Sequence, residues 1–315
     1  MGYLFNRRDL MRLGVVSAAG LSLSRSMGAT QGAESMALSM KPIPTSGEKI
    51  PVVGLGTNGY SVSDPAELAA RRAVIKRMAE LGASVIDTAP AYGESEAVLG
   101  GFMAELGIRA RMFVATKITA REGDEDPGRA MFENSLKRLR TDRVDLLQVH
   151  SLTGIDLLMP VLKDWKAAKR VRYLGATTSR GEQHADLLAA MNRHPLDFIQ
   201  VNYSLGDRAA ADRILPLAAE RGIAVLVNLP FGGRRRSLFK QSSGKPLPPY
   251  AAALGIASWG QFFLKYAISH PAVTCAIPGT TQLSHFDDNI GAARGALPDA
   301  KQRKQMEASW DALPA

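Results

Sequence analysis

The 315-residue sequence has little of what several protein classes require. It contains one cysteine, Cys275, which excludes an intramolecular disulfide and any metal site built on clustered cysteines. Cys275 lies in the apolar run 272–277, so we interpret it as a small buried hydrophobic residue. The apolar stretch near the N-terminus is about half the roughly 20 residues that span a bilayer, so we expect no stable membrane span.

Basic side chains give the chain a formal net charge of +9, but they are not organised for nucleic acid. Beyond the N-terminal segment they are scattered, apart from three arginines at 234–236, and no aromatic residues are interleaved with them. We therefore expect no nucleic-acid partner. A basic pocket for an anionic cofactor or substrate explains the charge at least as well.

The first 35 residues differ in character from the rest of the chain. Arg7 and Arg8 precede a short, mildly apolar stretch at 13–23, an order that resembles a twin-arginine export signal. We predict a signal segment at 1–35, recognised by the twin-arginine (Tat) translocase, and a periplasmic or otherwise extracytoplasmic mature protein. The alternative is a basic amphipathic helix on a cytoplasmic protein, and the cleavage site stays open.

Strand and helix patterns alternate from residue 53 to the end, after a hairpin expected over 41–52. Short apolar runs bounded by turn residues predict strands, and helical periodicity predicts a helix after each one. The predicted strands are 53–57, 84–87, 112–116, 144–150, 171–177, 197–202, 223–228 and 273–277. The pattern predicts one α/β domain over 40–315, a (β/α)8 TIM barrel with an N-terminal β-hairpin and an extra helix at 299–313.

The runner-up fold is an open, doubly wound sheet. No Gly-x-Gly-x-x-Gly turn follows the first predicted strand, and no domain linker is visible, which favours the barrel. In a barrel the carboxyl ends of all strands open on one face, and that face carries the site.

Four chemically capable side chains follow consecutive predicted strands at that face. Asp87 ends the second strand and Tyr92 comes five residues later, while Lys117 and His150 end the third and fourth. Each alone has an ordinary structural explanation, such as a turn cap for Asp87. Their succession along one rim favours a catalytic set.

The segment 82–93, Gly-Ala-Ser-Val-Ile-Asp-Thr-Ala-Pro-Ala-Tyr-Gly, resembles the signature of the aldo-keto reductase family. Segments 116–117, 145–150, 175–178, 199–202 and 277–279 resemble its later motifs in their usual order, so the match runs from about 41 to 296. The resemblance implies an oxidoreductase that transfers a hydride between NAD(P)H and an aldehyde or ketone, or the alcohol in reverse. The alternative is a dinucleotide-binding sensor or regulatory subunit with little turnover.

The family's catalytic positions map onto Asp87, Tyr92, Lys117 and His150. The resemblance makes Tyr92 the general acid, and the nearby Lys117 ammonium is expected to lower the phenol pKa from its usual value near ~10. Asp87 would hold Lys117 in place. His150 would donate a hydrogen bond to the substrate carbonyl.

The cofactor contacts carry over less completely. Gln200 matches a contact to the nicotinamide carboxamide, whereas Asn228 stands where many members place an aromatic ring. The segment that begins at Pro230 resembles the loop that straps the pyrophosphate, and an arginine among 234–236 could add charge there. The predicted cofactor-binding residues are Thr57, Thr177, Thr178, Gln200, Asn228, Pro230, Phe231, Thr280, Asp288 and Asn289.

Members that select NADP commonly carry Lys or Arg around 279–281 and at the position of His285, and this sequence has no fixed charge there. NADP(H) is favoured on family grounds, and NAD(H) stays open. The sequence specifies neither the carbonyl substrate nor the oligomeric state. Tyr60 and Leu152 are candidates for the pocket wall, and Trp165 is more typical of helix packing.

Overall fold

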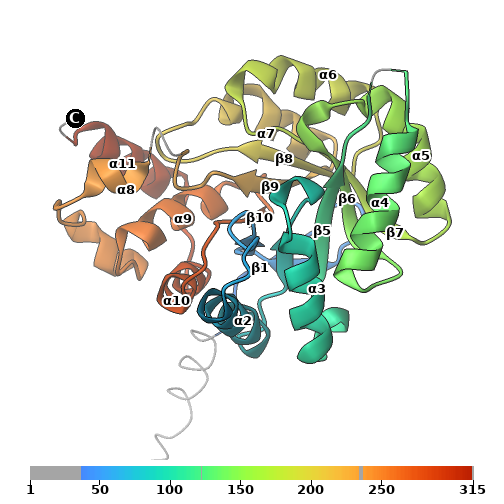
Figure 1. Cartoon of the computed structure of the whole chain (residues 1–315). Helices are drawn as coiled ribbons and strands as arrows, with labels where there is room; N and C mark the ends of the chain where they lie inside the picture. Colours follow the sequence, from blue (N-terminus) through green and yellow to red (C-terminus); the bar gives the residue numbers. More distant parts are fainter. Residues whose placement is uncertain (1–36, 122, 234–236, 314–315) are drawn as a thin grey trace, which may run out of the picture.

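The computed structural model describes residues 37–121, 123–233 and 237–313, so the predicted signal segment and the arginines at 234–236 lie outside the described residues. Eight parallel strands occupy the centre and helices surround them (Figure 1). The strands are β3 (Leu55–Gly56), β4 (Val85–Asp87), β5 (Phe113–Ile118), β6 (Val144–Val149), β7 (Val171–Thr177), β8 (Phe198–Asn202), β9 (Ala224–Asn228) and β10 (Cys275–Ala276).

The strands pair in the order in which they occur along the chain. Isolated parallel bridges from Val53 to Ala276 and from Gly56 to Gly279 join the first strand to the last. The sheet therefore closes on itself, which confirms the predicted barrel and excludes the open sheet. β3 and β10 are shorter than the predicted strands 53–57 and 273–277, and Val53, outside β3, makes an isolated bridge.

Helices cover the outside of the barrel. They are α2 (Pro65–Glu80), α3 (Ser95–Glu105), α4 (Asp126–Leu139), α5 (Ile155–Ala167), α6 (His184–Arg193), α7 (Ala210–Glu220), α9 (Trp259–Ser269), α10 (Leu283–Gly291) and α11 (Ala300–Asp311). The Asp64 side chain caps α2 by accepting the backbone N–H of Glu67, with Pro65 in the first turn. No helix in the described ranges is long and apolar enough to cross a membrane.

One helix lies where the sequence predicts a loop. α8 (Leu238–Ser242) interrupts the segment 230–249, and its Phe239 ring packs 4.9 Å from the ring of Phe231, between centroids. A helix of one turn has no periodicity to detect and depends on such tertiary contacts. α11, the predicted tail helix, packs beside α9 (Figure 1).

The N-terminal hairpin closes one end of the barrel. β1 (Met40–Pro42) and β2 (Lys49–Pro51) pair antiparallel, as predicted. Ile43 and Ile50, from this hairpin, pack against Phe113, Tyr173 and Phe198 in the barrel interior. The fully buried Cys275 belongs to the same cluster, which confirms its interpretation as a core residue. The interior is thus a packed core, and the opposite end is left for a site.

Candidate active site

The structure brings Asp87, Tyr92, Lys117 and His150 together at the carboxyl end of the strands. Asp87 is the last residue of β4 and Lys117 lies within β5, while His150 directly follows β6. Tyr92 ends a single 3-10 turn, Pro90–Tyr92, which returns the chain over the end of β4. Neighbouring parallel strands therefore supply all four side chains to one rim.

A chain of contacts links three of these groups. The Lys117 Nζ donates to the Asp87 Oδ2 at 2.7 Å and to the Tyr92 Oη at 3.4 Å. It also donates to the carbonyl oxygen of Thr88 at 2.9 Å, so each of the three ammonium N–H groups has an acceptor. The Tyr92 and His150 rings lie nearly perpendicular, with centroids 6.2 Å apart. The phenol and the imidazole therefore flank the same space.

Charge at the centre of this set is stable despite burial. Lys117 is 1% exposed and Asp87 is 2% exposed. Burial by itself lowers the pKa of the Lys117 ammonium, but the charge of Asp87 and the hydrogen bonds that the ammonium donates to Asp87 and Tyr92 outweigh it, so the pKa is raised. Lys117 therefore stays protonated at neutral pH.

The net pKa of Tyr92 differs from the expectation. Burial raises it above the ordinary tyrosine value and the Asp87 charge adds to this, while Lys117 acts in the expected downward direction without prevailing. Burial, followed by the Lys117 charge, lowers the pKa of His150 to about 4. His150 is therefore neutral at pH 7, with one ring N–H available as a donor.

A cleft of about 450 Å³ opens beside these side chains. Its walls include the predicted cofactor residues Thr57, Thr177, Thr178, Gln200, Asn228, Pro230 and Phe231. An adjoining cavity of about 300 Å³ is lined by the remaining three, Thr280, Asp288 and Asn289, with Phe231, Phe239, Gly279 and His285. Phe231 and Gly279 line both spaces, so an extended ligand could occupy the two together.

Several of the predicted cofactor side chains already have partners within the protein. Thr57, fully buried, donates to the carbonyl oxygen of Asp87 at 2.9 Å. The hydroxyl of Thr178 donates to the Gln183 Oε1 at 2.7 Å. The Asp288 carboxylate accepts hydrogen bonds from the side chains of Ser258 and Gln261. These groups shape the cleft, and a ligand would have to share their remaining lone pairs or protons.

Two buried acceptors in the cleft wall have no such partner. The Gln200 Oε1 and the Asn228 Oδ1 are without a hydrogen bond in the described part of the chain. The Asn228 Nδ2 donates to the carbonyl oxygen of Thr178 at 2.9 Å, which fixes the orientation of its amide. Because buried polar atoms in folded proteins are nearly always paired, these oxygens are suited to a ligand N–H donor.

The sequence did not identify all of the cleft. Ser151 and Leu229 also line it, and both have positive φ angles, 53° and 49°, which non-glycine residues rarely adopt. No sequence pattern signals such a conformation. Among the suggested wall residues, Tyr60 is fully buried and Trp165 packs on Phe132 in the core, so neither lines these cavities.

Comparison with known proteins gives a consistent result. The family model described as "Aldo/keto reductase family" matches residues 52–311. The Schizosaccharomyces pombe aldo-keto reductase yakc, whose name specifies NADP(+), is 26% identical over 307 residues, covering 83% of this chain and 89% of its own length. Probable aldo-keto reductase 1 of Glycine max is 27% identical over 317 residues, covering 82% of this chain and 89% of its own length.

Solved structures share the fold. An aldo-keto reductase from Bacillus halodurans, in its holo form, is 25% identical with a TM-score of 0.69, covering 87% of this chain and 96% of that one. An aldo/keto reductase from Klebsiella pneumoniae, in complex with NADP and acetate, is 24% identical with a TM-score of 0.68, covering 84% and 93%.

Proposed function

The chain belongs to the aldo/keto reductase family, and on that premise we propose that it transfers a hydride between NADP(H) and an aldehyde or ketone at the open end of the barrel. It is an NAD(P)H-dependent oxidoreductase, and the small-molecule carbonyl compound is its substrate. The observation that carries the assignment of roles is the buried chain of contacts from Asp87 through Lys117 to the Tyr92 hydroxyl.

Each residue of the set has a physical task in carbonyl reduction. When bound, the reduced nicotinamide supplies the hydride, and negative charge grows on the carbonyl oxygen. Tyr92 meets that charge by donating its phenolic proton. Lys117, held by Asp87, stabilises the phenolate that remains. The neutral His150 donates its ring N–H to the same oxygen and orients the carbonyl.

The cleft fits the cofactor at its nicotinamide end. The free acceptors on Gln200 and Asn228 suit the two amide protons of a carboxamide group. The adjoining cavity, with Phe231, Thr280, Asp288 and Asn289 in its wall, is proposed to hold the adenosine end. The described lining of that cavity contains no Lys or Arg to pair with a 2′-phosphate. We therefore expect NADPH to be preferred over NADH by no more than about tenfold in kcat/KM, roughly one charge-assisted contact.

Steady-state kinetics tests the function and separates it from the sensor alternative. We expect multiple turnovers of NADPH oxidation with a short aldehyde supplied in excess. A burst limited to one equivalent of cofactor would instead indicate a dinucleotide-binding module with little turnover. Binding of NADPH and NADH can be measured by quenching of the protein fluorescence. If neither dinucleotide binds at millimolar concentration, the assignment as a whole is contradicted.

We also propose that residues 1–35 direct export by the twin-arginine translocase, so that the mature enzyme acts in the periplasm. Arg7 and Arg8, followed by the mild apolar stretch 13–23, support this proposal. Changing both arginines to lysine in a bacterial host with an active twin-arginine pathway should retain the protein in the cytoplasmic fraction. Unchanged fractionation would favour a cytoplasmic enzyme with an unrelated N-terminal segment.

A further inference from the structure

A polar layer lies directly beneath the catalytic cleft, formed by Asp87, Gln148 and Gln200. Each follows, by two positions along its strand, an apolar residue of the barrel interior, Val85, Leu146 and Phe198 respectively. Because side chains alternate along a strand, all three point into the barrel. Their strands β4, β6 and β8 alternate in the sheet, which is how one layer of a barrel core is built.

Such layers are usually filled by Val, Ile and Leu, and here two amides surround a carboxylate. All three side chains are 3% exposed or less. The Gln148 Nε2 donates to the Asp87 Oδ1 at 3.3 Å, and the Gln200 Nε2 donates to the Asp87 Oδ2 at 3.5 Å. Lys117 approaches the same Oδ2 at 2.7 Å. Among the described residues, Gln148 is thus the one side chain that donates to Oδ1.

The barrel makes room for Gln148 at a structural cost. Gln148 pairs in register with Gly175 on β7, and a Cβ at Gly175 would lie 2.9 Å from the Gln148 Cγ. The Gln148 Oε1 is buried with no hydrogen-bond partner in the described part of the chain. A buried acceptor without a donor is unfavourable, so a leucine or methionine would suit this interior position better unless the amide N–H is needed.

We propose that Gln148 is a positioning residue, which through Asp87 holds the Lys117 ammonium against the Tyr92 hydroxyl. The inference rests on the proposed role of Tyr92 as proton donor. A neutral N–H on Oδ1 fixes the plane of the carboxylate, so that Oδ2 faces Lys117. It also disperses part of the carboxylate charge without adding a competing charge to the barrel interior.

Loss of this donor should act on Tyr92 in one direction. Without the Gln148 N–H, the negative charge of Asp87 acts more strongly on the Tyr92 phenol. Lys117 is also held less firmly. Each change disfavours the phenolate. The charged or titratable groups facing this set are Lys117 on β5, His150 after β6 and the Cys275 thiol on β10, whose pKa is raised by burial and then by Asp87. The pKa of Tyr92 should rise further.

The test compares Gln148→Met, which keeps the side-chain length but removes the donor, with Leu146→Met as a matched control in the same strand and interior. For Gln148→Met we expect kcat to fall about 10- to 100-fold, as misplaced catalytic groups do. The alkaline limb of the kcat profile for reduction should move to higher pH, with the Kd for NADPH changed less than twofold. Leu146→Met should change neither kcat nor the limb.

A second variant, Gln148→Asn, shortens the side chain by one methylene and so moves the amide away from Asp87. It tests the role of Gln148 if Gln148→Met does not fold. Wild-type kcat and an unmoved alkaline limb in the folded variants would overturn the inference, as would a loss of NADPH binding in parallel with kcat. Tyr92→Phe distinguishes failure of the role proposed for Gln148 from failure of the proposed function. If it is inactive while the Gln148 variants behave as wild type, only the role of Gln148 fails, and if it is fully active, the proposed function fails.

Discussion

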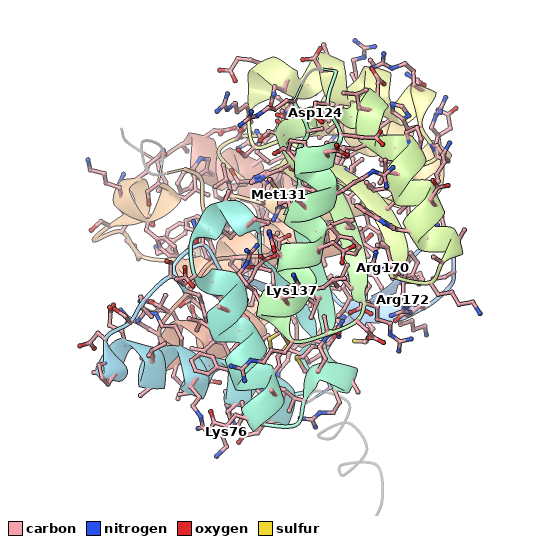
Figure 2. The ribbon with its side chains drawn as sticks, turned by 45° about the vertical axis from the view of Figure 1, so that its right-hand side comes forward. Lys76, Asp124, Met131, Lys137, Arg170 and Arg172 are labelled. Atoms are coloured by element: carbon pink, nitrogen blue, oxygen red, sulfur yellow. The ribbon has the colours of Figure 1, made fainter. Side chains whose placement is uncertain are left out.

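The two ends of the barrel treat their polar groups differently. At the end closed by the hairpin, the Lys41 Nζ donates to three backbone oxygens, those of Ile268, His270 and Val273, at 2.7, 2.9 and 2.6 Å. Arg172 joins the hairpin to the barrel by bonding both Glu48 and Asp145. In Figure 2, Arg172, on β7 near this end, lies far from Asp124, which precedes α4 at the other end.

The catalytic end has buried groups that lack such partners. The side-chain oxygens of Gln148, Gln200 and Asn228 are unpaired in the described part of the chain, and Ser151 and Leu229 have strained backbone conformations at the rim. The paired polar groups of the closed end stabilise the fold, while the unpaired oxygens of Gln200 and Asn228 line the cleft and remain available to a ligand. The same fold thus separates stability from chemistry along its axis.

The largest expected contrast is between two buried carboxylates, one at each end. Asp87→Asn leaves the Lys117 ammonium buried without its counter-charge, so we expect a loss of about 3–5 kcal/mol in the free energy of unfolding and near-complete loss of turnover. Asp145→Asn should cost less, about 1–3 kcal/mol, because its partners Arg109 and Arg172 reach solvent. Its kcat should stay within twofold of wild type. Chemical denaturation and steady-state kinetics measure both, and equal effects on turnover would remove the contrast.

A change at the closed end alone should affect stability and not chemistry. Lys41→Met removes the donor to three carbonyl oxygens, so we expect about 1–3 kcal/mol of destabilisation, the usual cost of unpaired buried acceptors. Burial lowers the pKa of Lys41 to about 8, so the unfolded chain binds more protons above that pH, and the wild-type protein should gain stability from this group as pH rises from 8 towards the unfolded value near ~10.4. Urea denaturation at pH 7 and pH 9 checks both, and a lowered kcat would show that the ends are coupled.

Two histidines, one at each end of the barrel, should show a smaller difference between the ends that depends on pH. Burial lowers the pKa of both His150, at the catalytic end, and His270, beside Lys41, to about 4. A depressed pKa in the folded state means that stability is full above the unfolded value near ~6.5 and is lost as pH falls through 4. His270→Gln should flatten the fall of Tm between pH 6.5 and 4 without altering the activity profile.

His150→Gln should flatten the same stability curve and also lower kcat/KM, since a glutamine amide replaces the imidazole N–H less well. In the wild type, the acid limb of kcat/KM should lie near pH 4. An acid limb near pH 6.5 would contradict the burial of His150 as described.

The sequence predicted the barrel and the position of four site residues, because both follow from regular patterns along the chain. Alternating strands and helices predicted the barrel, and the spacing of Asp87, Tyr92, Lys117 and His150 along successive strands predicted that they share one rim. It was uninformative about α8, which is too short for periodicity, and about the positive φ of Ser151 and Leu229, which no sequence pattern signals.

Electrostatic balance was also beyond the sequence. The neighbour Lys117 suggested a lowered pKa for Tyr92, yet burial and Asp87 prevail over it, a result that depends on depth within the protein. Gln148 lies within a recognised motif, but the absence of a hydrogen-bond donor to its side-chain oxygen becomes visible only once the barrel interior is assembled.

A single-turnover experiment with Tyr92→Phe tests the central claim most directly. Enzyme saturated with NADPH is mixed rapidly with aldehyde, and the decay of NADPH absorbance gives the rate of hydride transfer apart from binding and release. We expect an unchanged Kd for NADPH and a rate lower by about 10²–10⁴-fold, the usual contribution of a general acid. A rate close to that of the wild type would contradict the claim.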